Sequence, residues 1–384
     1  MRLLSKILFL LITLPACRED KQAAQAKTFL ELTDTLCLST QYRIPLSSKA
    51  MYFHEEQGKR YLTIENENTR EIIFLNIDNQ KIENIIQIKE DGPDGMPHNF
   101  GYAVKSLDSI FVPTDGFRLY LINRQGHVLK KIYFDTLDNG QNLPIRSFSR
   151  FSSPMLFKGD FTYGVQLDGI PHYQSEIPDI YKFCYQFNLA ANTACRMPAC
   201  HPVDFWKDQK KEVFFSWDFD GQRFIISPVF SHNLYLSKDL RQIDSVHAVQ
   251  SSWVHKFRDG NPQRLLSLNF YQFSREALST QSYLGIKYDP YREVYYRFFF
   301  PGAGRAGEMT DDEVLSAYQD QPNFGIMVLD KNFRVICELV LPENIYLQHH
   351  FFIAKEGLFL AANHPKNPDV KESELCFHIF TLRN

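Results

Sequence analysis

The stretch Gly101–Phe134 constrains the fold more than any other part of the sequence. It predicts four short strands joined by tight connections, and the dipeptide Asp115-Gly116 between the second and third strands is a strong hairpin signal. Four antiparallel strands without a helix cannot bury both faces alone, whereas several such sheets stacked around an axis can. The stretch therefore predicts one blade of a β-propeller.

The turn between the third and fourth strands of this template recurs along the chain. An apolar strand end is followed by Asp, Asn or Ser and by polar turn residues at Ile77–Ile82, Ile122–Val128, Leu236–Arg241 and Leu329–Val335. The first two copies begin 45 residues apart, which suits one blade. The last two begin 93 residues apart, so this interval holds either a seventh blade or a fifth blade with insertions.

The two ends of the chain favour six blades. The last unit supplies only three strands, at His349–Ala354, Leu358–Ala362 and Glu374–Phe380, and the isolated strand Thr28–Ser39 can supply the fourth. We therefore predict an all-β fold over residues 28–384, a six-bladed β-propeller whose N-terminal strand closes the last blade. Seven blades are the alternative.

Two insertions are expected next to the fifth blade. Residues 249–279 form an irregular connection with Leu265–Phe273 as an extra strand. Within Pro301–Pro322, the sequence Thr310-Asp311-Asp312-Glu313 is a capping box and predicts one short inserted helix. The acidic residues in its first turn suit the helix dipole.

The N-terminus predicts export and a lipid anchor. Arg2 and Lys6 precede the apolar run Ile7–Leu14, which is too short to span a bilayer as a helix. The run leads into Leu-Pro-Ala-Cys, which resembles a bacterial lipobox. We expect residues 1–16 to be a lipoprotein signal peptide, Cys17 to be diacylated, and residues 17–27 to be a lipidated tether. The alternative is an ordinary signal peptide with an incidental cysteine.

We expect the protein to be located at the cell outer membrane, to which the lipid anchor attaches it. Glu19 and Asp20 resemble the signal that exports lipoproteins of Bacteroidota to the cell surface, and both the surface and the periplasmic face stay open. The net charge of −3 gives no sign of a nucleic-acid partner.

Six further cysteines could be oxidised in an exported protein. Cys184 and Cys195 flank a predicted hairpin turn and Cys200 follows closely, which favours one disulfide among these three. A zinc site of Cys195, Cys200 and His201 lacks a second pair of ligands, so no metal site is predicted there.

The other three cysteines are Cys37, Cys337 and Cys376. Each lies among apolar residues of a predicted strand, where buried thiols are at least as well supported as disulfides. The pairing pattern among the six therefore stays open at this point.

Three features together resemble a known family. They are the lipobox, the turn Glu90–Gly95 ahead of the second blade, and the segment Tyr288–Arg297 in the fifth. They look like those of the six-bladed propeller lipoproteins of Bacteroidota, and the group that they resemble most is domain of unknown function 4221. The resemblance covers nearly the whole mature chain and implies the fold and an envelope location. It implies no activity, because the family has no established catalytic residues.

Propellers bind ligands at the mouth of the central channel, mostly through loops that lead into the innermost strands. His98 and Asn99 precede the innermost strand of the second blade, and His349 and His350 open that of the sixth. These four residues are candidates for lining the channel mouth. The alternative is that they are solvated loop residues.

Aromatic residues and arginines supply the other candidates for ligand binding. Tyr173 and Trp206, with Trp253, could form an aromatic platform for a sugar or peptide, and the better supported alternative is that they pack beneath long loops. Arg292 and Arg297 could clamp a carboxylate or phosphate, and the alternative is a structural salt bridge or stacking on tyrosine.

No catalytic motif is present among those with a known mechanism, such as Gly-x-Ser-x-Gly or His-Glu-x-x-His. Asp91 and Asp94 resemble part of a calcium loop but lack its full series of acids, so we interpret them as a turn and predict no cofactor, with calcium as the remaining candidate.

The leading hypothesis is a lipid-anchored envelope propeller that acts as a binding module for an unidentified peptide, glycan or protein, rather than as an enzyme. The alternative is a metal-dependent hydrolase of the lactonase type, in which Glu55, Asn99, Asp168 and Asp218 would converge at the channel.

Overall fold

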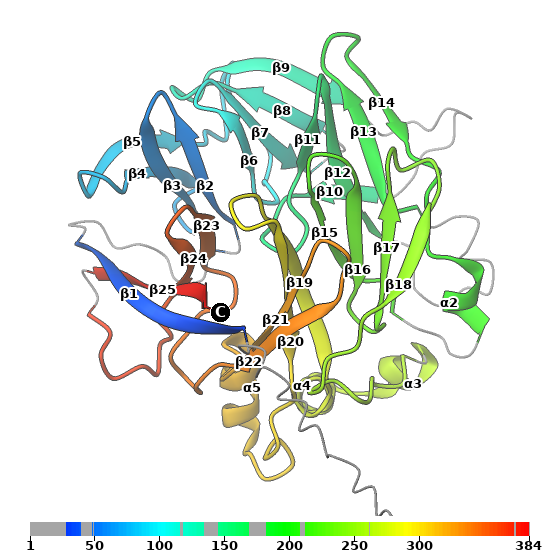
Figure 1. Cartoon of the computed structure of the whole chain (residues 1–384). Coiled ribbons are helices and arrows are strands. Elements are labelled where there is room, and N and C mark those ends of the chain that lie inside the picture. Colours follow the sequence, from blue (N-terminus) through cyan, green and yellow to red (C-terminus); the bar gives the residue numbers. More distant parts are fainter. Residues whose placement is uncertain are drawn as a thin grey trace, which may run out of the picture.

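The computed structural model of the chain is a ring of six antiparallel sheets around a central axis (Figure 1). It describes residues 28–39, 48, 50–115, 118–133, 145–168, 182–207, 212–260, 262–371 and 374–383. The predicted signal peptide and the predicted tether, with Cys17, lie outside the described residues. The prediction of six blades is confirmed against the alternative of seven.

The blades follow one another in chain order, and each begins with its innermost strand. Blade 1 is β2 (Met51–Glu56), β3 (Lys59–Asn66), β4 (Glu71–Asn76) and β5 (Lys81–Gln87); blade 2 is β6 (Ala103–Ser106), β7 (Ser109–Thr114), β8 (Arg118–Ile122) and β9 (Val128–Tyr133). Blade 3 is β10 (Ile145–Phe148) and β11 (Leu156–Lys158), both paired with β12 (Phe161–Asp168), then β13 (Cys184–Asn188) and β14 (Thr193–Arg196). Blade 4 is β15 (Phe215–Phe219), β16 (Phe224–Pro228), β17 (Asn233–Ser237) and β18 (Ser245–Ala248); blade 5 is β19 (Ser282–Asp289), β20 (Val294–Phe300), β21 (Gly325–Leu329) and β22 (Val335–Val340).

Blade 6 closes the ring by joining the two ends of the chain, as predicted. Its strands are β23 (Phe351–Ala354), β24 (Gly357–Ala361), β25 (Glu374–Arg383) and, outermost, β1 (Phe29–Ser39). β1 pairs antiparallel with β25 over its whole length. Leu38 of β1 is fully buried in the apolar core between blades 1 and 6, so the closure is a packed interface as well as a ladder of hydrogen bonds.

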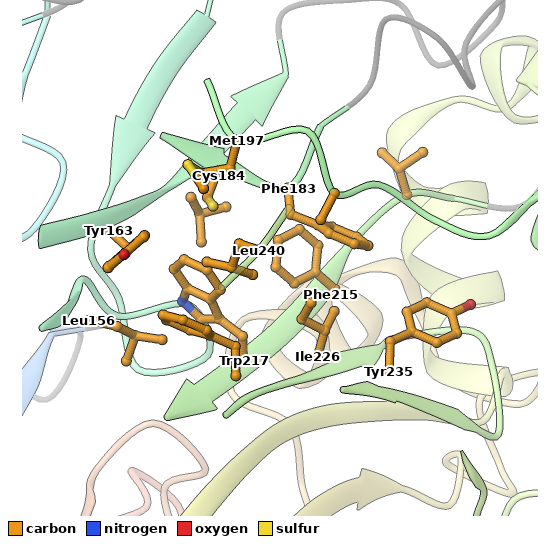
Figure 2. Packing of buried hydrophobic residues seen from close by; sticks show 14 residues of the cluster. Leu156, Tyr163, Phe183, Cys184, Met197, Phe215, Trp217, Ile226, Tyr235 and Leu240 are labelled. Carbon is orange, nitrogen blue, oxygen red and sulfur yellow. The ribbon is translucent and has the colours of Figure 1, made fainter. Parts of the chain in front are cut away.

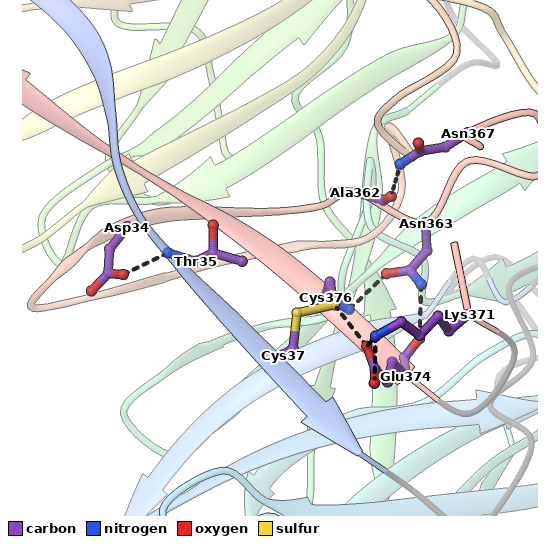
Figure 3. Close-up of a disulfide and its surroundings, with 9 residues drawn as sticks. All are labelled: Asp34, Thr35, Cys37, Ala362, Asn363, Asn367, Lys371, Glu374 and Cys376. Atoms are coloured by element: carbon purple, nitrogen blue, oxygen red, sulfur yellow. Dashed lines mark hydrogen bonds and ion pairs between the residues drawn. A yellow bond between two sulfur atoms is a disulfide. The ribbon is translucent and has the colours of Figure 1, made fainter. Parts of the chain in front are cut away.

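A disulfide between Cys37 and Cys376 joins β1 to β25 (Figure 3). The register of the two strands places these residues directly opposite each other. The prediction of a disulfide among Cys184, Cys195 and Cys200 was wrong, because Cys195 lies opposite Gln186 rather than opposite a cysteine, and all three remain thiols. Of the two alternatives left open for Cys37 and Cys376 the structure has the disulfide, whereas Cys337 is a thiol.

Apolar side chains fill the spaces between neighbouring blades. Figure 2 shows the cluster between blades 3 and 4, in which Trp217 of β15 lies among Tyr163, Phe183 and Phe215. Trp217 is fully buried, and its indole N–H donates to the carbonyl oxygen of Pro154 at 2.7 Å. The single polar atom of this side chain is therefore satisfied inside the core.

The two faces of the ring are built differently. We call the face where the innermost strands begin the loop face, and the face with the short turns from each first strand to the second, and from each third strand to the fourth, the turn face. Contacts between successive blades run around the whole turn face. They are Leu107 N to Glu56 Oε2 (2.8 Å), Lys105 Nζ to the oxygen of Gly159 (3.2 Å), Lys158 Nζ to the oxygen of Lys238 (2.5 Å), Arg223 Nη2 to the oxygen of Lys331 (3.3 Å), Arg292 Nη2 to the oxygen of Lys355 (2.7 Å) and Arg60 Nη1 to Glu356 Oε1 (2.7 Å).

The helices of the described residues all lie in connections on the loop face. α2 (Val203–Lys207) precedes β15, α3 (Pro262–Ser267) and α4 (Phe270–Ser279) precede β19, and α5 (Asp311–Gln319) precedes β21. Figure 1 shows α3, α4 and α5 gathered beside blades 4 and 5. Among these helices none has the length and apolar character to cross a bilayer.

Helix α5 is the predicted inserted helix, and Thr310 and Glu313 form its capping box. The prediction of an extra strand at Leu265–Phe273 was wrong, because this segment contributes to α3 and α4. Asn269 caps α4 and forms a reciprocal capping box with Gln272, a local signal that outweighs the apolar character of the segment.

Candidate functional site

The central axis of the propeller is filled by a segment of blade 3. Residues 149–155, which we call the central segment, interrupt the innermost strand between β10 and β11. The N–H of Ser149 donates to the oxygen of Phe100 in blade 2 at 2.9 Å, and its hydroxyl lies 2.8 Å from that of Tyr52 in blade 1. The hydroxyl of Ser153 donates to the oxygen of Phe215 in blade 4 at 3.0 Å.

Phe151 extends the central segment to the two remaining blades. Its ring centre lies 4.7 Å from that of His349 and 6.2 Å from that of Phe351, both at the start of blade 6. It also lies against Gly285 of blade 5, where an added Cβ would come within 3.5 Å of the ring. The central segment therefore contacts every other blade.

Gly101 permits this close crossing. Its φ of 84° lies in the left-handed region, and a Cβ at this position would lie 1.8 Å from the oxygen of Ser149. A larger residue would therefore displace the central segment from its contact with blade 2.

Glu65, Asn99 and Arg150 form a polar cluster where blades 1, 2 and 3 meet at the loop face. Glu65 is 2% exposed, and Nδ2 of Asn99 donates to its Oε1. Its Oε2 is buried and has no hydrogen-bond partner among the described residues. Burial raises the pKa of Glu65 to about 7, and Glu67 raises it further, while the Asn99 bond and the charge of Arg150 oppose the shift. This carboxyl therefore changes its protonation near neutral pH.

The predicted histidines divide between the surface and the core. His98 is exposed, and its ring centre lies 5.3 Å from that of Phe100. His350 is buried with its Nε2 2.7 Å from the oxygen of Ser48, so this nitrogen donates, and burial lowers the pKa of His350 to about 4. His350 thus joins blade 6 to the start of blade 1, while His349 packs on the central segment.

Arg292 lies on the turn face, away from the other candidates. Its Nη1 donates to Oδ2 of Asp289 at 2.9 Å and to the oxygen of Ala354 at 3.2 Å, and its Nη2 donates to the oxygen of Lys355 at 2.7 Å. These contacts hold blades 5 and 6 together.

Arg297 is fully buried in the interface between blades 4 and 5. It donates to the oxygens of Ser231 and Val249, each at 2.8 Å, and its guanidinium lies 3.3 Å from the ring centre of Tyr283. Burial lowers the pKa of Arg297 to about 10. The two arginines therefore lie in different places and do not form a shared clamp.

The proposed aromatic platform is only partly described. Tyr173 and the side chain of Trp206 lie outside the described residues. Trp253 lies in the connection before α3 and is 48% exposed on the loop face.

The residues of the hydrolase alternative are not brought together where they are described. Asn99 lies at the loop face with Glu65, whereas Glu55 and Asp218 lie near the turn-face ends of β2 and β15. Asp218 accepts from the N–H of Tyr288 at 2.8 Å and lies 4.0 Å from Nζ of Lys287, whose pKa burial lowers. The side chain of Asp168 lies outside the described residues.

The partial calcium and zinc motifs serve other contacts. Asp94 accepts from the N–H of Val128 at 2.8 Å and lies 3.0 Å from Nδ1 of His127, so both carboxylate oxygens are engaged. His201 stacks on Phe205 with ring centres 4.0 Å apart. Within the described residues, the only grouping of three potential metal ligands is Cys37, Cys376 and Glu374, and its two cysteines form the disulfide.

A cleft of about 600 Å³ opens on the loop face between residues 255–259 and helix α4. It is lined by basic, acidic and hydroxyl side chains together with Phe257. The sequence placed this region in an irregular connection and singled out none of the cleft residues, because they come from two separated segments without a motif of their own. The cleft, which we call the α4 cleft, and the polar cluster at the axis both belong to the loop face.

Comparison with known proteins gives a family and a fold. The family model described as a domain of unknown function, DUF4221, matches residues 27–339. The crystal structure of a DUF4221 member from Bacteroides vulgatus is similar, with a TM-score of 0.79, 23% identity, and coverage of 94% of this chain and 99% of that one. A Bacteroides fragilis protein described as a presumed exported protein is 10% identical, with a TM-score of 0.51 and coverage of 94% and 97%. No curated protein matches the chain.

Proposed function

The chain belongs to the DUF4221 family, and from this membership and the contrast between its two faces we propose that it is a lipid-anchored module of the cell envelope that binds its ligand on the loop face. The observation that carries the proposal is the unequal construction of the faces. The described helices and the α4 cleft of about 600 Å³ lie on the loop face, whereas the turn face consists of short turns with a hollow of about 340 Å³ between blades 4 and 5. Propellers of many functions use loops on one face of a rigid ring, so the loop face is the surface that can vary with the ligand.

The lipid anchor is supported by the lipobox and by the position of β1. Cys17 precedes Thr28 by 11 residues, which span at most about 38 Å when extended. β1 is the outermost strand of blade 6, so a tether that precedes it would join the ring at its outer edge. The Bacteroides fragilis protein that is described as exported supports an envelope or secreted location.

The ligand is proposed to be a peptide, glycan or protein rather than a molecule that passes through the ring, because the central segment fills the axis. The hydrolase alternative gains no support from the described positions of Glu55, Asn99 and Asp218, which lie at opposite ends of the innermost strands.

Site-specific photo-crosslinking in cells tests which face binds. A photoreactive phenylalanine analogue is placed at Trp253 on the loop face or at Tyr291 on the turn face, a matched pair that is 48% and 42% exposed. We expect crosslinked products from position 253 and none from position 291. Products from position 291 alone would contradict the proposal.

Membrane fractionation tests the anchor. We expect wild-type protein in the outer-membrane fraction, with a diacylated cysteine at its mature N-terminus, and the Cys17→Ala variant with its signal peptide uncleaved at this site. Soluble wild-type protein with a free N-terminus beyond residue 17 would contradict the anchor.

A further inference from the structure

The α4 cleft has the size of a ligand site. Its volume of about 600 Å³ lies within the range of about 300–1,000 Å³ that is typical of small-molecule sites. One wall is the chain at His255 and Lys256, whose N–H groups donate to Oε1 of Gln281 at 2.6 and 2.9 Å. This amide fixes an irregular segment against the start of blade 5.

The base of the cleft is organised by Arg258. Its side chain is 7% exposed and forms a bidentate pair with Glu212, at 2.5 and 2.7 Å. The guanidinium also lies 5.1 Å from the ring centre of Phe230 and 4.7 Å from that of Phe273. The carboxylate of Glu212 and the two aromatic rings together fix the orientation of the guanidinium. This part of the cleft is therefore formed before any ligand binds.

The opposite wall is helix α4. Arg264 and Glu276 form a second bidentate pair, with both distances 2.6 Å. The hydroxyls of Ser279 and Thr280 donate to the carbonyl oxygens of Arg275 and Glu276, each at 2.8 Å. Because these hydroxyl hydrogens are used within the helix, the remaining lone pairs can accept hydrogen bonds from a ligand.

One basic side chain of the cleft, Lys256, has no carboxylate partner among the described residues. Arg258 pairs with Glu212, and Arg264 pairs with both Glu276 and Asp259. Lys256 is exposed, and the described residues place no carboxylate within 4.0 Å of its Nζ. A single unmatched ammonium favours a ligand with a single negative charge at that position. A dianionic phosphate would lack a second unmatched cation.

We propose that the α4 cleft binds a saccharide that carries a carboxylate, a uronic acid unit, with the carboxylate at Lys256. Fixed guanidinium–carboxylate pairs and hydroxyl acceptors suit a ligand whose hydroxyls both donate and accept hydrogen bonds. The half-buried Phe257 supplies an apolar surface to the cleft, and the exposed Trp253 lies four residues earlier in the chain. The inference rests on the proposed function, because it names the ligand class of the loop face.

Calorimetric titration of the full-length protein in detergent tests the proposal. The probe is trigalacturonate, and its fully methyl-esterified form is the matched neutral control. We expect the ester to bind at least about tenfold more weakly, because it loses a charge-assisted hydrogen bond. Lys256→Ala should weaken trigalacturonate binding by a similar factor, Lys256→Arg should restore most of it, and Arg241→Ala on the turn face should leave it unchanged.

Three results would overturn the proposal: no binding of trigalacturonate at millimolar concentration, equal binding of the ester, or an unchanged affinity in the Lys256→Ala variant. In each case the photo-crosslinking pair at positions 253 and 291 still reports independently on the loop face. Crosslinks from position 253 would then support the proposed function with another ligand class. Their absence would contradict both the proposed function and the proposed ligand.

Discussion

Opening the Cys37–Cys376 disulfide should destabilise the whole propeller and not only its edge. The bond joins residues that are 339 positions apart, so it turns almost the entire described chain into one covalent loop. Without it, β1 is held in blade 6 by strand pairing and by the burial of Leu30 and Leu38. The main effect is on the unfolded chain, which gains conformational entropy because its two ends become free to separate.

The expected loss follows from the length of the loop. Closing a loop of this length removes chain entropy worth about 6 kcal/mol at 25 °C in the chain-entropy treatment, as an upper value. For a domain of this size the entropy of unfolding converts that loss to a fall of about 8 °C in Tm. The fall comes on top of local fraying, because β1 is the outermost strand and no further strand covers it.

The assay is thermal unfolding of the Cys37→Ser, Cys376→Ser double variant beside wild type, with and without a reducing agent. Cys337→Ser is the matched control, because Cys337 is a half-buried thiol hydrogen-bonded to the backbone of Leu30 and so lies next to β1 without crosslinking it. Hydrogen exchange should show β1 losing protection first in the double variant.

The reasoning would be refuted by equal Tm values for the oxidised wild type and the double variant. It would also be refuted if the reducing agent lowered the Tm of the double variant as much as that of wild type, because reduction would then act through another site.

Three further predictions concern the axis and the inter-blade contacts, and each is measured by chemical denaturation. In the folded protein the carboxyl of Glu65 keeps its proton up to about pH 7, whereas in the unfolded chain it ionises near its ordinary pKa of 4.5. The free energy of unfolding of wild type should therefore fall by up to about 3 kcal/mol between pH 4.5 and 7. The Glu65→Gln variant should gain stability relative to wild type over this range, and a difference that does not change with pH would contradict the prediction. Arg297→Met should cost about 3 kcal/mol, because the carbonyl of Ser231 loses its buried donor and that of Val249 keeps only the Tyr283 hydroxyl at 3.3 Å. A cost as small as that of Arg241→Ala, below about 0.5 kcal/mol, would show that the carbonyls find other partners. Phe151→Ala should cost about 2 kcal/mol through lost packing against His349 and Phe351, and an unchanged midpoint would mean that the ring does not support the central segment.

The blades were predictable because each repeats a local pattern of strands and turns. The closure was predictable because blade 6 supplies three strands and Thr28–Ser39 had no other partner. The same closure brings the strands of Cys37 and Cys376 side by side, so a disulfide between them was partly predictable. What the sequence lacked was the register, and a slip of one residue would have placed the sulfurs on opposite faces of the sheet.

The loop face was harder to predict because its contacts join distant segments. Asn99 was identified from its place before an innermost strand, but its partner Glu65 lies in a strand pattern that does not reveal which blade it faces. The central segment looked like an ordinary start of blade 3, and only the ring brings Phe151 against blades 5 and 6. The α4 cleft combines a loop with a helix that was expected as a strand, so no spacing in the sequence could connect Lys256 with Gln281.

The measurement that tests the central claim most directly is binding of the full-length protein to arrays of envelope glycans and peptides, with one face altered at a time. The loop-face variant carries Trp253→Ala, Lys256→Ala and Tyr318→Ala, and the turn-face variant carries Tyr291→Ala, Arg241→Ala and Arg334→Ala, all at exposed positions. We predict that the loop-face variant loses the ligands that wild type binds and that the turn-face variant keeps them. Loss of binding in the turn-face variant alone would contradict the assignment of the loop face as the binding surface.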